Sequence, residues 1–174
     1  MLNELPDDGC RYEVIDGELF VTPSPSLVHQ HAIAALFRLI DPYTLQLGLD
    51  SLFAPVAVTF SERREVQPDA LVLPKRADGR HATRFSDVGR LILAVEVLSP
   101  STQRVDRQEK RRLYQQEGLP EYWIVDTTAR VFERWRPTSA LPEVLEHTIS
   151  WHPVPSHPPL HIDLIKYFRE LLDE

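Results

Sequence analysis

The chain has 174 residues, with 19 basic and 26 acidic side chains and a formal charge of −7 at pH 7. Hydrophobic residues at 43% and charged residues at 26% are ordinary values for a globular domain and argue against general disorder. No apolar run approaches the roughly 18 residues that span a bilayer, and the acidic N-terminus lacks the pattern of a signal peptide. The single Cys10 excludes an intramolecular disulfide and a thiolate-rich zinc site. We therefore expect one cytoplasmic domain over residues 1–174, with no membrane segment.

The first quarter of the chain predicts a β-hairpin followed by a helix. Strand-like segments flank Asp16-Gly17, a pair that tolerates the positive φ angles of a tight turn, and predict a hairpin over residues 12–23. A Ser-Pro-Ser run then offers an N-cap for a helix over residues 27–39, where apolar residues recur at helical spacing. Pro42 should end this helix at Asp41, because the residue before a proline is displaced from the α region.

The remaining elements predict a mixed α/β or α+β domain with one central sheet. A charged helix is predicted over residues 100–117, and Asp163 should cap a short C-terminal helix. The strand, helix and strand between residues 91 and 126 form a βαβ-like unit, which should cross over right-handedly. The predicted strands cover residues 53–60, 66–73, 91–98, 121–126, 130–136 and 145–151.

Glu96 is the most informative residue, because it lies in an almost continuously apolar strand. A buried carboxylate is costly unless it is paired, protonated or bound to a metal. An ion pair with a core arginine would by itself explain a buried Glu96, without any functional role. Asp69, however, follows Pro68 in another predicted strand, and the two carboxylates converge if these strands are neighbours. Such a pair shares a proton or holds a hard divalent cation.

The helix after Glu96 carries a third element of the pattern. Asp106, Lys110 and Tyr114 stand four residues apart and share one helical face. Taken alone, this spacing indicates a solvated Asp–Lys pair. Because the helix leaves the end of the Glu96 strand directly, the same face could instead look back at the carboxylates.

Other polar residues have ordinary structural explanations. His29 and His31 are two residues apart on the first helix and therefore diverge, which is poor geometry for binding one metal. We expect both at the surface or at the edge of the core. Ser99 and Ser101 are expected to cap the following helix, although a helix N-terminus near a metal could also bind a phosphate.

Several sequence blocks stand together in the order and spacing of one family. They are YEVIDGEL at residues 12–19, QPD at 67–69, VEVLSPST at 95–102, the helix face described above, and GLPEYWIVD at 118–126. In these blocks the chain resembles the Uma2 family, over residues 5 to about 136. The resemblance implies the PD-(D/E)XK restriction-endonuclease-like fold, a central mixed sheet flanked by helices that is often found in dimers.

The family's motif places an Asp after a Pro on one strand, an acidic residue on the next, and a Lys two positions later. Asp69 and Glu96 match the first two parts, whereas Leu98 stands in the lysine position. In this fold the lysine can come from the following helix, and Lys110 is the available residue. The departure at Leu98 puts the catalytic assignment in question more than the fold.

The resemblance implies a nuclease that depends on Mg²⁺ or Mn²⁺, with Asp69, Glu96 and Lys110 as the catalytic residues. Asp69, Glu96 and the backbone carbonyl of Val97 would hold the ion, and Lys110 would orient water or stabilise the transition state. Glu13 would add an outer carboxylate; alternatively, it is an edge-strand residue beside the hairpin turn. The auxiliary candidates are Glu13, Asp106 and Tyr114, and the candidates for contacts with substrate phosphate are Ser99, Ser101, Arg104 and Arg107.

Two other functions remain open. Leu98 favours a catalytically inactive module that dimerises or binds nucleic acid, and such a module would gain no stability from Mg²⁺ or Mn²⁺. Two carboxylates also suit glycoside hydrolysis, but no exposed aromatic platform for a sugar is evident.

The negative net charge by itself argues against a nucleic-acid partner, but the charge is unevenly distributed along the chain. Residues 75–112 contain ten basic and five acidic side chains, a local charge of +5 that leaves −12 for the rest of the chain. This stretch brackets Glu96 and permits a local phosphate-binding groove. We therefore expect a nucleic-acid partner, DNA rather than RNA, and a homodimer as the default assembly.

Overall fold

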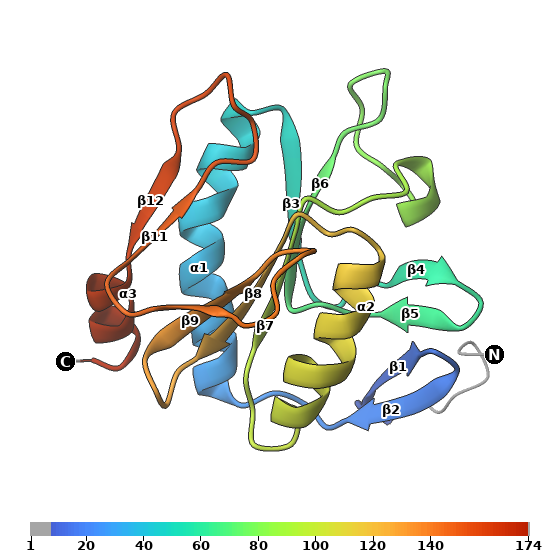
Figure 1. Ribbon diagram of the computed structural model, residues 1–174, viewed down its shortest axis with the longest axis horizontal. Helices are drawn as coiled ribbons and strands as arrows, with labels where there is room; N and C mark the ends of the chain where they lie inside the picture. Colours follow the sequence, from blue (N-terminus) through green and yellow to red (C-terminus); the bar gives the residue numbers. More distant parts are fainter. Residues whose placement is uncertain (1–7, 174) are drawn as a thin grey trace.

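A six-stranded mixed sheet forms the centre of the molecule, as described for residues 8–173 by a computed structural model (Figure 1). Its strands are β3 (Leu49–Phe53), β6 (Ala70–Pro74), β7 (Leu93–Val97), β8 (Glu121–Asp126), β9 (Val131–Trp135) and β10 (Glu143–Leu145). They lie in the order β10-β9-β8-β7-β6-β3. Only β7 and β8 are parallel; the other described neighbours are antiparallel. The N-terminal residues 1–7, part of the segment that argues against a signal peptide, lie outside the described residues.

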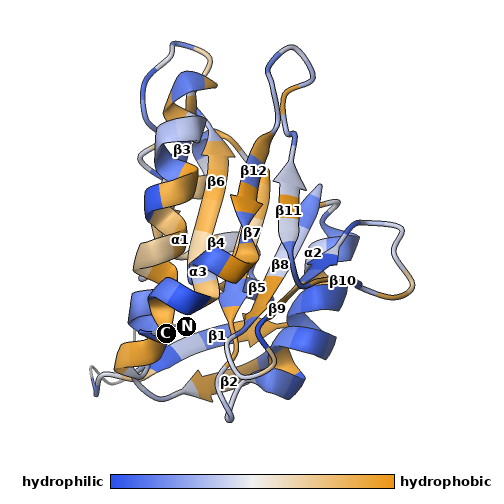
Figure 2. Cartoon of the chain, turned by 90° about the vertical axis from the view of Figure 1, so that its left-hand side faces the viewer, coloured by the Kyte–Doolittle hydropathy of each residue, from blue (hydrophilic) through white to orange (hydrophobic). Residues whose placement is uncertain are grey.

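Different elements cover the two faces of this sheet. One face packs against α1 (Leu27–Gln46), α3 (Leu164–Leu171) and the paired strands β11 (Thr148–Trp151) and β12 (Leu160–Asp163), which lie in front of the sheet in Figure 2. The other face packs against α2 (Arg111–Gln116) and a small sheet with the order β2-β1-β5-β4. The strands of the small sheet are β1 (Arg11–Ile15), β2 (Glu18–Thr22), β4 (Val58–Ser61) and β5 (Arg64–Val66).

Strand β7 is buried on both faces, which explains its nearly continuous apolar sequence (Figure 2). Side chains alternate along a strand: Leu93 and Val95 pack into the core under α1, whereas Ala94 packs into the core under α2. Glu96 has the same parity as Ala94. Its carboxylate therefore faces the layer formed by α2 and the small sheet.

Several sequence predictions are confirmed. The turn between β1 and β2 has positive φ angles at Asp16 (53°) and Gly17 (89°), as a tight hairpin turn requires. Strand β7, the helical segment and parallel β8 form the predicted βαβ unit. The Asp163 carboxylate accepts a hydrogen bond from the Lys166 backbone N–H (2.9 Å) and caps α3. The structure is thus the predicted mixed domain, with a central sheet flanked by helices and an N-terminal hairpin.

The prediction that Pro42 ends the first helix is wrong. Helix α1 continues through Pro42 to Gln46, and both Ile40 and Thr44 are buried. The Thr44 hydroxyl donates to the Asp41 carbonyl (2.9 Å), and the Ser51 hydroxyl donates to the Asp41 carboxylate (2.5 Å). The hydrogen bond from Ser51 and the burial of Ile40 and Thr44 offset the backbone hydrogen bond that a proline removes from a helix.

Three strands were predicted too long, because the chain changes partners within each of them. The segment 53–60 is divided between β3 and β4, which belong to different sheets, and the segment 66–73 is divided between β5 and β6. Pro55 and Pro68 stand at these breaks, where a residue that cannot donate to a ladder is tolerated. The segment 145–151 is divided between β10 and β11, because the backbone at His147 instead accepts a hydrogen bond from Leu164 N–H (2.8 Å).

The predicted helix over residues 100–117 begins later and is less regular. Helical structure runs over residues 103–116, and the part Val105–Lys110 is π-helical before it continues into α2. Single π-helical turns often occur at functional sites. Within residues 8–173, no helix is both long and apolar enough to cross a membrane.

Candidate active site

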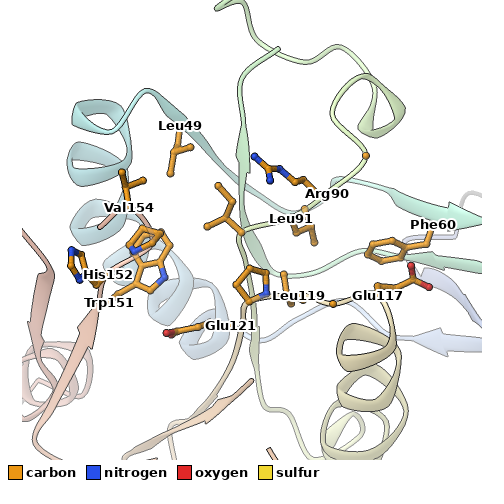
Figure 3. A pocket seen from close by; sticks show the side chains of 15 residues that line it. Leu49, Phe60, Arg90, Leu91, Glu117, Leu119, Glu121, Trp151, His152 and Val154 are labelled. Atoms are coloured by element: carbon orange, nitrogen blue, oxygen red, sulfur yellow. The ribbon is translucent and has the colours of Figure 1, made fainter. Parts of the chain in front are cut away.

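Two pockets lie at opposite ends of β7. The larger one, about 500 Å³, is at the N-terminal end beside Leu91, and its lining includes Leu119 and Trp151 (Figure 3). The smaller one, about 380 Å³, is at the C-terminal end, where Asp69 and Glu96 line it. The smaller pocket thus contains both predicted catalytic carboxylates, and we place the candidate active site there.

The pairing of β6 with β7 brings the two carboxylates together. The strands are antiparallel neighbours, with Ala70 opposite Val95, so Asp69 comes beside the end of β7. The Val97 backbone N–H donates to Asp69 Oδ2 (2.8 Å). The side chains of Asp69 and Glu96 are each 2% exposed. The expectation that their strands are neighbours is confirmed.

Two basic side chains hold the Asp69 carboxylate. The Arg11 guanidinium on β1 donates to Oδ1 (2.8 Å) and to the Gln67 carbonyl (3.0 Å), and His29 Nε2 on α1 lies 3.0 Å from Oδ2. Burial would raise the pKa of Asp69, but the hydrogen bond with His29 and the charges of His29 and Arg11 hold it well below its ordinary value. Asp69 is therefore ionised at neutral pH.

Lys110 lies among three further carboxylates. Its Nζ is 2.9 Å from Glu13 Oε2, 2.9 Å from Glu96 Oε1 and 3.6 Å from Asp106 Oδ1. Burial would lower the pKa of Lys110, but these carboxylates raise it well above its ordinary value, so the ammonium stays charged. The other oxygen of Glu13 accepts a hydrogen bond from the Gln67 backbone N–H (2.7 Å), which ties β1 to the site.

Carboxylates outnumber the permanent cations in this buried cluster. Burial raises the pKa of Glu96 and of Asp106, and the Lys110 ammonium opposes both shifts. Uncompensated buried charge is costly, so the cluster favours a further proton or cation. The cluster consists of the carboxylates of Glu13, Asp69, Glu96 and Asp106 and the cations of Lys110 and Arg11, together with His29.

Comparison with known proteins shows the family. The family model described as "Uma2: Putative restriction endonuclease" matches residues 1–164. The chain belongs to the Uma2 family. It is also similar to a crystal structure from Anabaena variabilis ATCC 29413, described as a putative nuclease belonging to DUF820. The TM-score is 0.77 at 21% sequence identity, over 98% of this chain and 96% of that chain, which shows a shared fold. None of the curated proteins compared with the chain matches it.

The predicted phosphate contacts of this Uma2 chain have different surroundings. Ser99 and Ser101 line the smaller pocket, and their hydroxyls are 3.0 Å apart. The side chain of Arg104 is 66% exposed. The Arg107 guanidinium is held by Asp126 (2.9 Å) and Glu133 (2.6 Å). We therefore do not retain Arg107 as a proposed phosphate contact.

The auxiliary residues Glu13, Asp106 and Tyr114 are all buried. Glu13 and Asp106 belong to the cluster around Lys110, so the predicted helical face does look back at the carboxylates. Tyr114 packs against Tyr122 with ring centroids 4.8 Å apart, and its hydroxyl has no hydrogen-bond partner among the described residues.

Sequence reasoning missed Arg11 and His29 as neighbours of the site. His31 is exposed, but His29 is buried and lines the smaller pocket. The helical spacing from His29 to the buried Ala32 and Ile33 was the signal that could have placed it on the inner face. Arg11 is two residues before Glu13 on β1 and therefore shares its face.

The donor set of this Uma2 site suits a hard divalent cation. In the described range, no three His, Cys, Asp or Glu side chains are grouped so that they alone could hold a metal ion. Mg²⁺, however, is usually bound by one or two carboxylates and keeps several waters. Asp69, Glu96 and the Val97 backbone all line one pocket, beside an excess of buried carboxylates over permanent cations. These residues fit such an ion.

The basic stretch of residues 75–112, which brackets Glu96 in the sequence, is divided between the two ends of the sheet. Strand β6 ends at Pro74 and is antiparallel to β7, so residues 75–90 connect the strands at the N-terminal end of β7. Arg90 lines the larger pocket. The ten basic side chains of the stretch therefore do not gather at Glu96, because half of them lie at the other end: Lys75, Arg76, Arg80, Arg84 and Arg90.

Proposed function

We propose that this Uma2 protein is a metal-dependent nuclease of the PD-(D/E)XK type. The observation that carries the proposal is the convergence of Asp69 and Glu96 from neighbouring strands into one pocket. Asp69, Glu96 and the carbonyl of Val97 would hold one Mg²⁺ or Mn²⁺. When bound, such an ion lowers the pKa of a water and neutralises the charge that develops on a phosphodiester.

The surrounding side chains orient the two carboxylates. Arg11 and His29 hold the two oxygens of Asp69, and Lys110 holds Glu96. Lys110 is not among the residues that line the pocket, so we propose that it is a positioning residue that acts through Glu96. Ser99 has a hydroxyl at the pocket and is proposed to donate to a substrate phosphate.

A catalytically inactive module is the second candidate. Leu98 stands where the family motif has a lysine, and the Lys110 ammonium is already paired with two carboxylates at 2.9 Å. In such a module the same buried charges would serve only to hold β1, β7 and the helical segment together.

Cleavage assays distinguish the two candidates. The purified protein is incubated in Mg²⁺ or Mn²⁺ with DNA and RNA, beside Asp69→Ala and the control Glu170→Ala, which changes an exposed carboxylate on α3. The nuclease proposal expects cleavage by the wild type and the control, and its loss in Asp69→Ala. If the wild type cuts no substrate, or if Asp69→Ala cuts every substrate that the wild type cuts, the inactive module is the better description.

The proposal includes the expected partners and setting. We propose a homodimer, the commonest assembly of soluble oligomers, that acts on DNA in the cytoplasm. Light scattering of the purified protein measures the mass of the assembly, and parallel DNA and RNA assays measure the preference.

A further inference from the structure

The candidate catalytic carboxylates lie at the floor of a small pocket. Asp69 and Glu96 are each only 2% exposed, so a phosphodiester has to enter the pocket to reach them. Its volume of about 380 Å³ is near the lower end of the roughly 300–1,000 Å³ typical of small-ligand pockets. The walls come from three separate parts of the chain, which are residues 22–29, 97–102 and 127–128.

These dimensions favour a flexible strand over a duplex. Double-stranded DNA is stiff, with a persistence length of about 50 nm, so bending one of its strands sharply into a recessed pocket costs deformation energy. A single strand can bend at one nucleotide and place its backbone between the three walls. The room available corresponds to about one nucleotide unit rather than to two paired strands.

The lining has no Phe, Tyr or Trp side chain among the described residues. Bases therefore have no such aromatic ring on which to stack. Hydroxyl groups can donate to phosphate and sugar oxygens whatever the base. The hydroxyl-bearing side chains of the lining are Thr22, Ser24, Ser26, Ser99, Ser101, Thr102, Thr127 and Thr128.

The charges at this end of the sheet also disfavour a duplex. Among the described residues, Arg11 is the only Arg or Lys in the lining, and it is bonded to Asp69 (2.8 Å). The basic residues of the segment 75–90 lie at the other end of β7. Proteins that bind a duplex commonly neutralise several phosphates, and this pocket offers no such row of cations.

We propose that the substrate of this site is an unpaired polynucleotide strand, held by its sugar–phosphate backbone without recognition of bases, and that intact duplex is excluded. This inference rests on the proposed nuclease function. In the reaction, a bond forms between phosphorus and a water oxygen, the bond from phosphorus to one sugar oxygen breaks, and a proton from the water passes to that leaving oxygen.

Cleavage of circles tests the inference without interference from strand ends. The wild type and Asp69→Ala are incubated in Mn²⁺ with a single-stranded DNA circle, a single-stranded RNA circle, a closed duplex DNA circle and bis(p-nitrophenyl) phosphate. We expect the wild type to cut at least one single-stranded circle ten times or more faster than the duplex. A ratio below ten overturns the inference.

The small diester separates the two ways of failing. If the wild type hydrolyses it and Asp69→Ala does not, phosphodiester hydrolysis stands, and cleavage of the duplex or of no circle overturns the inference alone. If neither the diester nor any circle is hydrolysed, the proposed function fails and the inference fails with it.

A narrowed pocket gives an independent test. Ser101→Tyr adds an aromatic ring at the wall, whereas Ser86→Tyr adds the same ring at an exposed position in the 75–90 connection. We expect Ser101→Tyr to slow cleavage of the single-stranded circle at least tenfold and Ser86→Tyr to change it less than twofold. Equal rates for the two variants overturn the proposal that the strand enters this pocket.

Discussion

The two ends of β7 carry pockets of opposite character. At the N-terminal end, the larger pocket is lined by apolar side chains such as Leu119 and Trp151 and by Glu117 (Figure 3). Glu117 is paired with Arg64 outside the pocket (2.6 Å). At the C-terminal end, the smaller pocket buries an excess of carboxylates beside Lys110. We therefore place the candidate active site by its buried charge rather than by pocket volume, because the fold has to compensate the desolvation of that charge.

The carboxylates at the two ends differ in their surroundings. Glu121 at the larger pocket accepts a hydrogen bond from Trp123 Nε1 (2.7 Å), and Arg134 lies 3.9 Å away. Burial raises the pKa of Glu121, and these two groups oppose the shift. Glu96 instead shares one lysine with other carboxylates. An ordinary structural acid and a candidate catalytic acid thus lie on neighbouring parallel strands.

The largest expected effect concerns activity. Glu96→Gln removes a proposed metal ligand and should lower the rate of cleavage at least about 1,000-fold, equivalent to about 4 kcal/mol in the activation barrier. Glu117→Gln changes a carboxylate of the larger pocket and should alter the rate less than about twofold. A comparable loss in Glu117→Gln would place the chemistry at the larger pocket.

The next effect concerns stability. Lys110→Met leaves the buried carboxylates without their cation and should lower the free energy of unfolding by about 3 kcal/mol. Removing one partner of a buried ion pair costs more than removing one partner of a surface pair. Thermal unfolding should show a fall in Tm of roughly 6–12 °C. Lys166→Met, at an exposed position on α3, serves as the control and should shift Tm by about 1 °C or less. A Lys110→Met protein as stable as the control would contradict the buried network.

Stabilisation by metal should depend on the carboxylates at only one end of the sheet. At a metal concentration about 100 times Kd, Mg²⁺ or Mn²⁺ should raise the free energy of unfolding by about 2.7 kcal/mol. Thermal shift assays should show the increase in the wild type and in Glu117→Gln, and its loss in Asp69→Ala. A wild type that shows no shift up to millimolar metal would favour the inactive module.

The smallest effect is a pH dependence. The pKa of Asp69 is lowered in the folded state, so its ion pairs contribute full stability above about pH 4 and lose it as the pH falls towards the folded pKa. The contribution of Glu96 to stability has the opposite pH dependence, because its pKa is raised in the folded state and protonation therefore favours folding. Denaturant unfolding at pH 5 and pH 3 should therefore show Asp69→Asn losing about 1 kcal/mol less than the wild type. Glu170→Gln should lose as much as the wild type; a parallel loss in Asp69→Asn would refute the assignment.

Local sequence patterns were sufficient to predict the central βαβ unit and to identify the two candidate catalytic carboxylates. The apolar run around Glu96 predicted a strand buried on both faces, and Pro68 directly before Asp69 marked the second acidic residue. The helical spacing from Asp106 to Lys110 placed both on one face, and the structure brings that face to Glu96. These features depend on periodicity and on neighbours in sequence, which the chain itself displays.

Long-range contacts accounted for the failures. Helix α1 passes through Pro42 because contacts to Ser51 and burial of Ile40 compensate the lost hydrogen bond. Arg11 contacts Asp69 across 58 positions of sequence, and no local pattern indicates that pairing. The basic segment 75–90 precedes Glu96 in the sequence, but the direction of β6 carries it to the other end of the sheet.

The sequence by itself determined the kind of domain, the order of its main elements and the acidic residues that form the candidate site. It could do so because alternation, helical spacing and the cost of a buried carboxylate are local properties of the chain. Only the tertiary structure decided which cations neutralise those carboxylates, which end of the sheet holds them and how narrow their pocket is. Those properties depend on strand order and direction, which bring residues far apart in sequence within a few ångströms of one another.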